Sequence, residues 1–242
     1  MNKSPPKRSA KKVATRAVPA VDAPEPRGAR RKRETRARLL EAALRLMAEK
    51  GMEGVAINEI TEAADVGFGS FYNHFESKEA IYDAVMDQVF ESFGDAIDRL
   101  VKDVRDPAEV IAVSVRHTLL RARREPVWGR FLVREGFSPQ VLTRGLGQRL
   151  FRDIMLGLTA KRFVSDDPMM AFIAVGGTVL ATISAQLQFS PGGDSRNASI
   201  ARELGYDADN LPERAAAIVL RTLGLKASDA QTVAGRPLPV GS

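Results

Sequence analysis

Apolar residues recur at intervals of three and four along most of the chain, which is the period of an α-helix. In residues 33–50 the pattern runs from Leu40 to Met47, and Gly51 follows it as a residue that can end a helix. No segment longer than a few residues alternates apolar and polar positions as a half-buried strand would. The sequence therefore predicts an all-α fold.

Residues 57–78 contain two short helical patterns separated by a turn. Asp65, which tolerates a left-handed backbone, marks the turn between them. In the second pattern Phe71 and Phe75 lie four residues apart and are expected to face inward, so the polar residues beside them face outward. A helix, a tight turn and a second helix with an acid-free outer face form the geometry that enters a DNA major groove.

The polar and basic residues of this region are candidates for DNA contact. Serine, asparagine and histidine can bond base edges or phosphates, and lysine and arginine neutralise phosphate charge. Phe68 either contacts a thymine methyl or packs on the domain, and packing is the expected alternative. The predicted DNA-binding residues are Asn58, Phe68, Gly69, Ser70, Tyr72, Asn73, His74, Lys78, Arg33 and Arg36.

Nine residues here fit one family signature, namely Ile60, Val66, Gly69, Ser70, Phe71, Tyr72, His74, Phe75 and Lys78. On these residues the chain resembles the tetracycline-repressor (TetR) family of bacterial transcriptional regulators. Three positions depart from the family pattern: Ala56 stands where a Thr or Ser usually caps the first helix, Asp65 replaces a turn glycine, and Phe68 replaces a Lys or Arg. From residue 101 onward the resemblance rests only on the number and order of helices.

A repeat of four from Ile81 to Ile97 predicts a long helix over residues 77–100. Its start belongs to the DNA-reading region and its end to the region that follows, so we expect it to be the rigid link between them. Later helices are predicted over residues 107–124, 139–158, 168–189 and 212–223, with loops over 163–167 and 191–210.

Residues 168–193 carry no charged side chain, which raises the possibility of a membrane span. Several Thr, Ser and Gln residues make the segment too polar for a bilayer core, and its small residues favour close approach of another helix. In the TetR family the last two long helices of each subunit form a four-helix bundle with a two-fold mate. The resemblance therefore implies a homodimer, with interface candidates Ala174, Gly177, Thr178, Ala181, Ala185, Ala216, Val219, Leu220 and Leu223.

Positive charge is concentrated at the N-terminus. Residues 1–37 contain twelve Lys and Arg against three Asp and Glu, a net charge of +9, whereas the whole chain has a net charge of +6. A basic arm beside a DNA-reading unit is favoured by counterion release, although such tails also serve solubility alone. We expect the arm to be disordered until an anionic partner orders it.

The chain lacks the features of a secreted protein or an enzyme. It has no cysteine and no apolar signal segment near its start, so a cytoplasmic location is expected. No metal-binding or catalytic motif is present, and no cofactor or metal is predicted. Seven residues are candidates for an apolar effector pocket, with plain core packing as the alternative: His117, Trp128, Phe131, Phe137, Phe151, Met155 and Phe172.

These observations predict four segments: residues 1–30 as a disordered basic arm, 31–76 as a helix-turn-helix DNA-binding domain, 77–225 as a helical effector-binding and dimerisation domain, and 226–242 as a flexible tail. The predicted function is a repressor that binds a palindromic double-stranded DNA operator as a homodimer and is released by a small apolar effector. One alternative is a ligand-independent DNA-binding dimer with an architectural or activating role, and a more distant one is an all-α enzyme.

Overall fold

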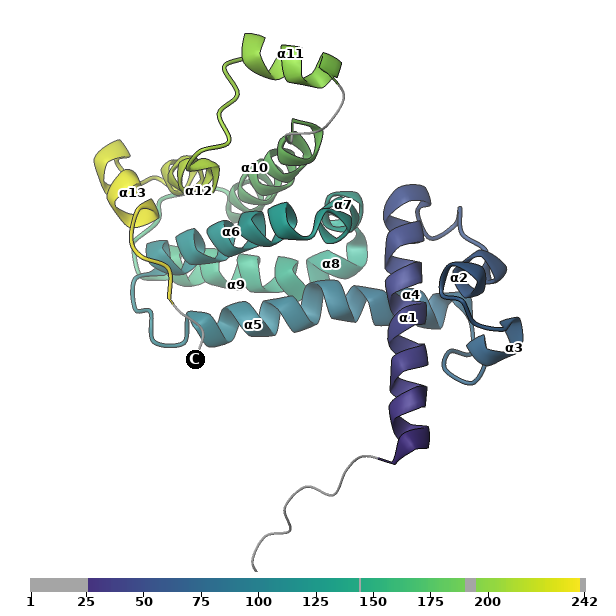
Figure 1. Cartoon of the computed structure of the whole chain (residues 1–242). Coiled ribbons are helices and arrows are strands. Elements are labelled where there is room, and N and C mark those ends of the chain that lie inside the picture. The colour runs from purple at the N-terminus through teal and green to yellow at the C-terminus, as the bar shows by residue number, and fades with distance from the viewer. Residues whose placement is uncertain (1–25, 144, 190–194, 240–242) are drawn as a thin grey trace, which may run out of the picture.

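The structure, a computed structural model, describes residues 26–143, 145–189 and 195–239, and every regular element in these ranges is a helix. The predicted all-α fold is therefore confirmed. A small N-terminal unit of three helices stands beside a larger helical bundle, and one long helix runs from the first into the second (Figure 1).

The N-terminal unit consists of α1 (Arg27–Lys50), α2 (Ile57–Ala63) and α3 (Phe68–Phe71). The α1 helix buries Leu39, Ala43 and Met47, and it ends where Gly51 takes a φ of 75°. It begins four residues earlier than the domain predicted to start at residue 31, because the Arg- and Lys-rich stretch after Pro26 contains good helix formers. Residues 1–25, most of the predicted arm, lie outside the described part of the chain.

The predicted linking helix is confirmed, but it is made of three consecutive pieces: α4 (Lys78–Met86), the π-helical turn η1 (Asp87–Glu91) and α5 (Ser92–Leu100). Ser77 caps its start by accepting a hydrogen bond from the Ala80 N–H at 3.1 Å. A π turn holds one extra residue per turn and so changes which side chains face each core. We call residues 78–100 the linker helix.

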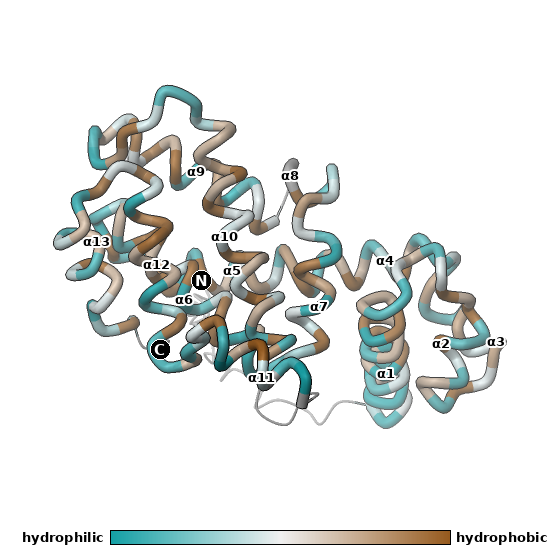
Figure 2. The backbone as a smooth tube through the Cα atoms, turned by 90° about the horizontal axis from the view of Figure 1, so that it is seen from above, coloured by the Kyte–Doolittle hydropathy of each residue, from teal (hydrophilic) through white to brown (hydrophobic). Residues whose placement is uncertain are grey.

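The bundle comprises α6 (Pro107–Arg124), α7 (Pro126–Glu135), α8 (Pro139–Thr143), α9 (Gly145–Thr159), α10 (Pro168–Gln188) and α12 (Leu211–Thr222). The α6 helix lies at its centre and packs against α7, α9, α10 and α12. Asp106 starts α6 by accepting from the Ala108 N–H at 3.0 Å. Apolar segments face one another inside the bundle, and the outer surface is more polar (Figure 2).

Two contacts fix the N-terminal unit to the bundle. The C-terminal end of α1 packs on α7, where the Arg134 side chain donates to the Glu49 carbonyl oxygen at 2.8 Å. On α4, the Tyr82 hydroxyl donates to Glu135 Oε2 at 2.8 Å. The DNA-reading helices therefore follow the orientation of the linker helix and α7.

Two predicted segments in the second half of the chain were wrong. The single helix predicted over residues 139–158 is divided into α8 and α9, because Gly145 has a φ of 66°, which a continuous α-helix excludes. The loop predicted over 191–210 contains α11 (Ser195–Glu203), which stands apart from the bundle beyond α10 and α12 (Figure 1). The predicted loop over 163–167 is confirmed.

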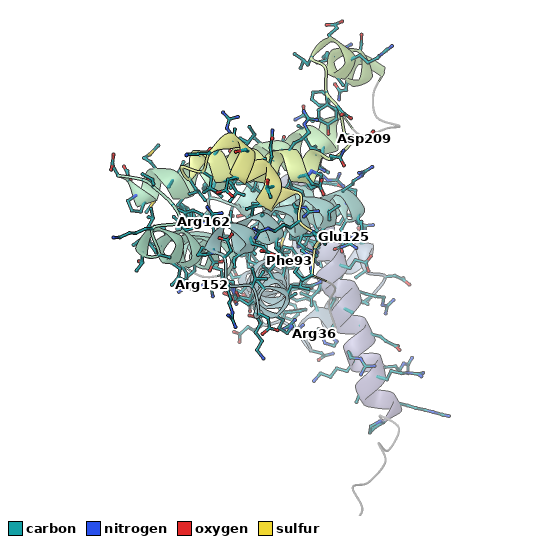
Figure 3. All side chains as sticks on the ribbon, turned by 90° about the vertical axis from the view of Figure 1, so that its left-hand side faces the viewer. Arg36, Phe93, Glu125, Arg152, Arg162 and Asp209 are labelled. Carbon is teal, nitrogen blue, oxygen red and sulfur yellow. The ribbon has the colours of Figure 1, made fainter. Side chains whose placement is uncertain are left out.

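The flexible tail predicted from residue 226 was also wrong. Its residues 227–234 form α13 (Ala227–Ala234), which buries Ala230, Val233 and Ala234 against α12 and α6. Long-range ion pairs hold it there: Arg162, labelled in Figure 3, binds Asp106 at 2.9 Å and Asp229 at 2.7 Å. A short alanine-rich helix has little intrinsic stability, so these tertiary contacts decide its structure.

The α10 helix is long and apolar enough to cross a membrane by length and composition alone, with a mean hydropathy of 1.7 in its most apolar window. Only 22% of that window is buried within the chain. Met169, Met170 and Ile173 are among its exposed side chains. In a helical bundle, such an exposed apolar face is the usual surface for another helix.

One stability prediction follows from the packing of α9. A Cβ added to Gly157 would lie 2.0 Å from Cδ2 of the buried Phe163 ring, so Gly157→Ala should lower the free energy of unfolding by about 1–3 kcal/mol. Urea denaturation followed by circular dichroism measures this. Gly28→Ala is the matched control, because nothing lies within 4 Å of its added Cβ. Equal stability of the two variants would contradict the close packing of Gly157 on Phe163.

Candidate DNA-binding surface and ligand cavity

The turn between α2 and α3 is tightly held. Asp65 has the predicted left-handed conformation, with a φ of 52°, and the Val66 N–H donates to the Thr61 carbonyl oxygen at 3.0 Å. Arg38 of α1, which the sequence analysis did not single out, donates to the Asp65 carbonyl oxygen at 3.3 Å. The turn is therefore hydrogen-bonded to α2 through Thr61 and to α1 through Arg38. Because of these bonds, α3 has a defined direction relative to α1 and α2.

The first helix of the pair starts without a side-chain hydroxyl. Ala56 at its N-cap offers no acceptor, but its N–H donates to Glu59 Oε2 at 2.9 Å. A hydrogen bond from Lys50 and this backbone bond lower the pKa of Glu59. The glutamate therefore stays ionised and supplies the reciprocal half of a capping box.

The outer face of α3 carries two aromatic rings. Phe71 and Phe75 are buried as predicted, whereas Phe68 is 54% exposed and Tyr72 is 52% exposed. The rings of Phe68 and Tyr72 meet edge to face with their centroids 5.7 Å apart. Phe68 therefore packs only partly on the domain, through Tyr72, and its contact with a base stays a prediction.

His74 lies beside the basic face of α1. Its Nδ1 atom is buried with no hydrogen-bond partner among the described residues. Burial, together with the positive charges of Lys32 and Arg36, lowers the pKa of His74. The lowered pKa favours the neutral imidazole near pH 7, which can form hydrogen bonds but carries no positive charge for a phosphate. The Arg36 guanidinium lies 4.7 Å from the Phe75 ring centroid.

The other predicted DNA-binding residues lie on or next to the same three helices. Asn58, Gly69, Asn73, Arg33 and Arg36 are exposed, and Ser70 is half-buried. The Lys78 side chain is 21% exposed, and its Nζ lies 3.9 Å from Glu53 Oε2. At 3.9 Å the ion pair with the exposed Glu53 is weak and does not hold the ammonium firmly. The contact of each of these residues with DNA stays a prediction.

A cavity of about 110 Å³ lies in the bundle, bounded by the linker helix, α6, α9 and α10. Its walls are mostly apolar, and its polar lining comes from few side chains. These polar side chains are Asp98, Ser114, Thr118, Arg149 and Asp153.

Two α9 residues give this cavity a donor next to an acceptor. Arg149 and Asp153 are four residues apart and so share one face of the helix. Burial raises the pKa of Asp153, whose Oδ1 accepts from Arg152 Nε at 2.8 Å. Arg149 uses its Nε and both Nη atoms to bind carboxylates, but a guanidinium has five N–H donors, so two are left.

The hydroxyl groups in the cavity are directed toward the backbone. Thr118 donates to the Ser114 carbonyl oxygen at 2.7 Å, and Ser114 donates to the Val110 carbonyl oxygen at 2.8 Å. Both hydroxyls keep lone pairs, so toward the cavity they act as acceptors. A ligand with a hydroxyl hydrogen therefore fits this lining better than one with acceptors only.

Of the seven predicted effector residues, the structure places two at the cavity, Phe137 and Phe172. Trp128 and Phe131 are instead buried in the core, as the alternative reading held. His117 is not part of the lining, and its Nε2 is buried without a partner among the described residues.

Phe151 and Met155 are also absent from the lining. Phe151 packs edge to face against Phe172 at 6.0 Å, and Met155 is 39% exposed. Arg149 and Asp153 were missed because two charged residues one helical turn apart look like an ordinary solvated face. The signal that could have found them was their position among the leucines of one amphipathic helix.

The predicted dimer residues of α12 need correction. Ala216, Val219, Leu220 and Leu223 are fully buried inside the chain, so they face the subunit's own core. The exposed side of α12 carries Ile218, which is 49% exposed, instead. On α10 the predicted residues remain available, since Ala181 is exposed and Ala174, Gly177, Thr178 and Ala185 are half-buried.

A three-helix unit with an exposed recognition helix, rigidly joined to a bundle with a ligand-sized cavity, defines a helix-turn-helix DNA-binding protein. Residues 39–85 match the family model described as bacterial regulatory proteins of the tetR family, and residues 106–236 match the tetracyclin repressor-like C-terminal domain. The chain belongs to the TetR family. It is a transcriptional regulator and not an enzyme.

Curated relatives match over part of their length. The transcriptional repressor DhaR of Mycobacterium sp. (strain GP1) is 40% identical over 72 residues, which is 30% of this chain and 36% of DhaR. The regulator AcrR of Shigella flexneri is 30% identical over 87 residues, or 36% of this chain and 40% of AcrR. The chain thus spans less than half the length of these relatives.

A solved structure matches over its whole length. The crystal structure of RolR in complex with the ligand resorcinol is 37% identical, with a TM-score of 0.60, and the match covers 88% of this chain and 100% of that one. The structure of the fatty acid degradation regulator FadR from Bacillus halodurans is 18% identical, with 79% and 97% coverage and a TM-score of 0.60, and shares the fold.

Two substitutions should separate base reading from phosphate binding. Phe68→Ala should weaken binding to the specific site by about 1 kcal/mol or more with little effect on non-specific DNA, because an apolar ring reads a base. Lys78→Ala should weaken both alike and reduce the slope of log K against log salt by about 1. Fluorescence anisotropy over a salt series measures both. Equal loss on both DNAs for Phe68→Ala would exclude a base contact.

Proposed function

We propose that this protein is a transcriptional repressor that binds a palindromic operator as a homodimer and is released by a small hydroxylated aromatic compound. The observation that carries the DNA-binding part is the exposed α3 face, where Phe68 and Tyr72 project beside Asn73 without any acid between them. DhaR, which is 40% identical over 72 residues, is named as a repressor.

The exposed faces of α10 and α12 support a two-fold dimer. The α10 helix has no charged residue and buries only 22% of its most apolar window within the chain. Ile173 of α10 and Ile218 of α12 are 41% and 49% exposed. A second copy that packs on both helices would cover these side chains and hold two recognition helices at one separation, as successive half-sites require.

The cavity supports the choice of effector. A dry cavity of about 150 Å³ is known to hold benzene. The cavity of about 110 Å³ is comparable, so a single ring is about the largest ligand it admits without rearrangement. A ring hydroxyl can donate to Asp153 and accept from Arg149, which satisfies both polar groups at once. Resorcinol, the ligand of RolR, is a compound of this class.

The ligand releases the operator if it binds more tightly to an orientation of the linker helix that does not suit the operator. Phe90, Ile97 and Asp98 of the linker helix form one wall of the cavity. A ligand that binds better to a displaced wall shifts the population toward that position and changes the spacing of the recognition helices.

We expect Ile218→Glu to dissociate the dimer, because it buries a charge in the proposed interface. Operator affinity should fall about 100-fold or more, since the two half-sites are then bound independently. Sedimentation velocity and anisotropy on the selected operator measure the two effects. Leu156→Glu on α9, at a leucine that is 57% exposed, is the control and should stay dimeric. A dimeric Ile218→Glu variant would place the interface elsewhere.

The effector is tested on an operator selected by the protein from random-sequence DNA. Resorcinol should dissociate that complex, and Asp153→Asn should weaken resorcinol binding about tenfold or more while operator binding is retained, because the hydroxyl loses a charged acceptor. Isothermal titration calorimetry measures the binding.

The same site has a predictable pH dependence. The pKa of an ordinary aspartate is about 3.9. Because burial raises the pKa of Asp153 above that value, its carboxylate becomes protonated at a higher pH than an ordinary aspartate does. Resorcinol affinity should therefore fall as the pH is lowered through this raised pKa. An affinity that stays constant there would argue against a hydrogen bond to Asp153.

A further inference from the structure

Arg149 of α9 is bound to three acids on the linker helix. Its Nη1 donates to Glu91 Oε2 at 2.8 Å, its Nη2 to Asp95 Oδ1 at 2.5 Å, and its Nε to Asp98 Oδ2 at 2.9 Å. The acids follow one another at spacings of four and three, so they lie on one face of the helix. Arg152, labelled in Figure 3, adds a second bond to Asp98 at 2.8 Å.

The Arg149 ion pairs are more than an exposed surface network. The arginine side chain is only 18% exposed, Glu91 and Asp98 are 35% and 34% exposed, and Asp95 is 56% exposed. Partial burial lowers screening by solvent, and charge-assisted bonds to a planar guanidinium are directional. Burial alone would raise the pKa of Asp98, but hydrogen bonds from Arg152 and Arg149 bring it below its usual value. The pair of Asp98 with Arg149 thus remains charged at neutral pH.

The contact lies where the linker helix changes its winding. Glu91 is the last residue of the π turn, and Asp95 and Asp98 belong to α5. Two glycines allow α9 and the linker helix to pack closely. A Cβ on Gly94 would lie 2.8 Å from Arg149 Nη1, and one on Gly145 would lie 2.8 Å from Phe90 Cβ. A π turn interrupts the regular α-helical hydrogen bonding, and α9 therefore contacts the linker helix at its irregular turn.

The same arginine also lines the ligand cavity, between Asp98 and Asp153. We infer that Arg149 is a positioning residue that couples occupancy of the cavity to the orientation of the linker helix. The inference rests on the proposed function. In the free protein the guanidinium holds the linker helix in the orientation that suits the operator. A ligand hydroxyl that engages Arg149 and Asp153 draws the guanidinium away from Glu91 and Asp95 and lets the linker helix and α3 move.

The test removes the contact without altering the cavity. Glu91 and Asp95 do not line the cavity, so the double variant Glu91→Gln, Asp95→Asn keeps the wall and the shape of both side chains but removes two charges. The matched control is Asp103→Asn, Asp166→Asn, which removes the same charge at two exposed positions away from Arg149. This control corrects for the higher affinity that any loss of negative charge gives toward DNA.

Without any ligand, the double variant should bind the selected operator about fivefold or more weakly than the matched control, a typical size for coupling between sites. Binding to non-specific DNA should be equal for the two, since α3 itself is unchanged. Resorcinol should then reduce operator affinity by a smaller factor in the double variant than in the control. Equal operator affinity of the two proteins would overturn the inference.

A second measurement needs neither DNA nor ligand. Hydrogen exchange of the backbone amides of α4, residues 78–86, should be faster in the double variant than in the control if the ion pairs position the linker helix. If the wild-type chain selects no operator, the proposed function fails, and this exchange rate still decides the role of Arg149. Unchanged α4 exchange would show that the ion pairs stabilise α9 and α5 only locally.

Discussion

One helix serves two hydrophobic cores, and the rest of the molecule depends on this. Ile81 and Val85 of the linker helix are buried next to the DNA-reading helices, while Val89, Phe93 and Ile97 are buried in the bundle. Because both sets of contacts are close-packed, the helix cannot move in one core without moving in the other. The DNA-binding unit is therefore mechanically part of the bundle rather than a domain on a flexible tether.

The cavity lies against this same helix. It is bounded on one side by the linker helix and on another by α9, and its charged lining consists of Asp98 of the linker helix with Arg149 and Asp153 of α9. A ligand there occupies space between two elements that ion pairs already join, so it competes with existing contacts rather than filling an isolated void. In the proposed mechanism, binding energy is therefore available to change the position of the wall.

The outer surface of the bundle adds a second constraint. The charge-free α10 helix leaves apolar side chains exposed, and the exposed side of α12 contributes Ile218. Such a surface is unfavourable in water for a single subunit, and the proposed dimer would bury these apolar side chains. The same pairing would place two α3 helices on one side of a duplex, and the spacing between them would depend on both linker helices.

The sequence alone determined the helical fold and the helix-turn-helix, because these depend on contacts between residues a few positions apart. The inward pair Phe71 and Phe75, the left-handed Asp65 and the Ser77 cap are all local consequences of residue type and spacing. Only the tertiary structure decided which face of α12 is buried, that residues 227–234 form a helix, and that Phe68 is exposed. The helix over residues 227–234 depends on partners far along the chain, such as Arg162, which binds Asp106 and Asp229, 56 and 67 residues away. For the same reason the charged lining of the cavity was invisible in sequence: a solvated charge and a charge turned toward a cavity have the same local pattern, and only the packing of distant helices separates them.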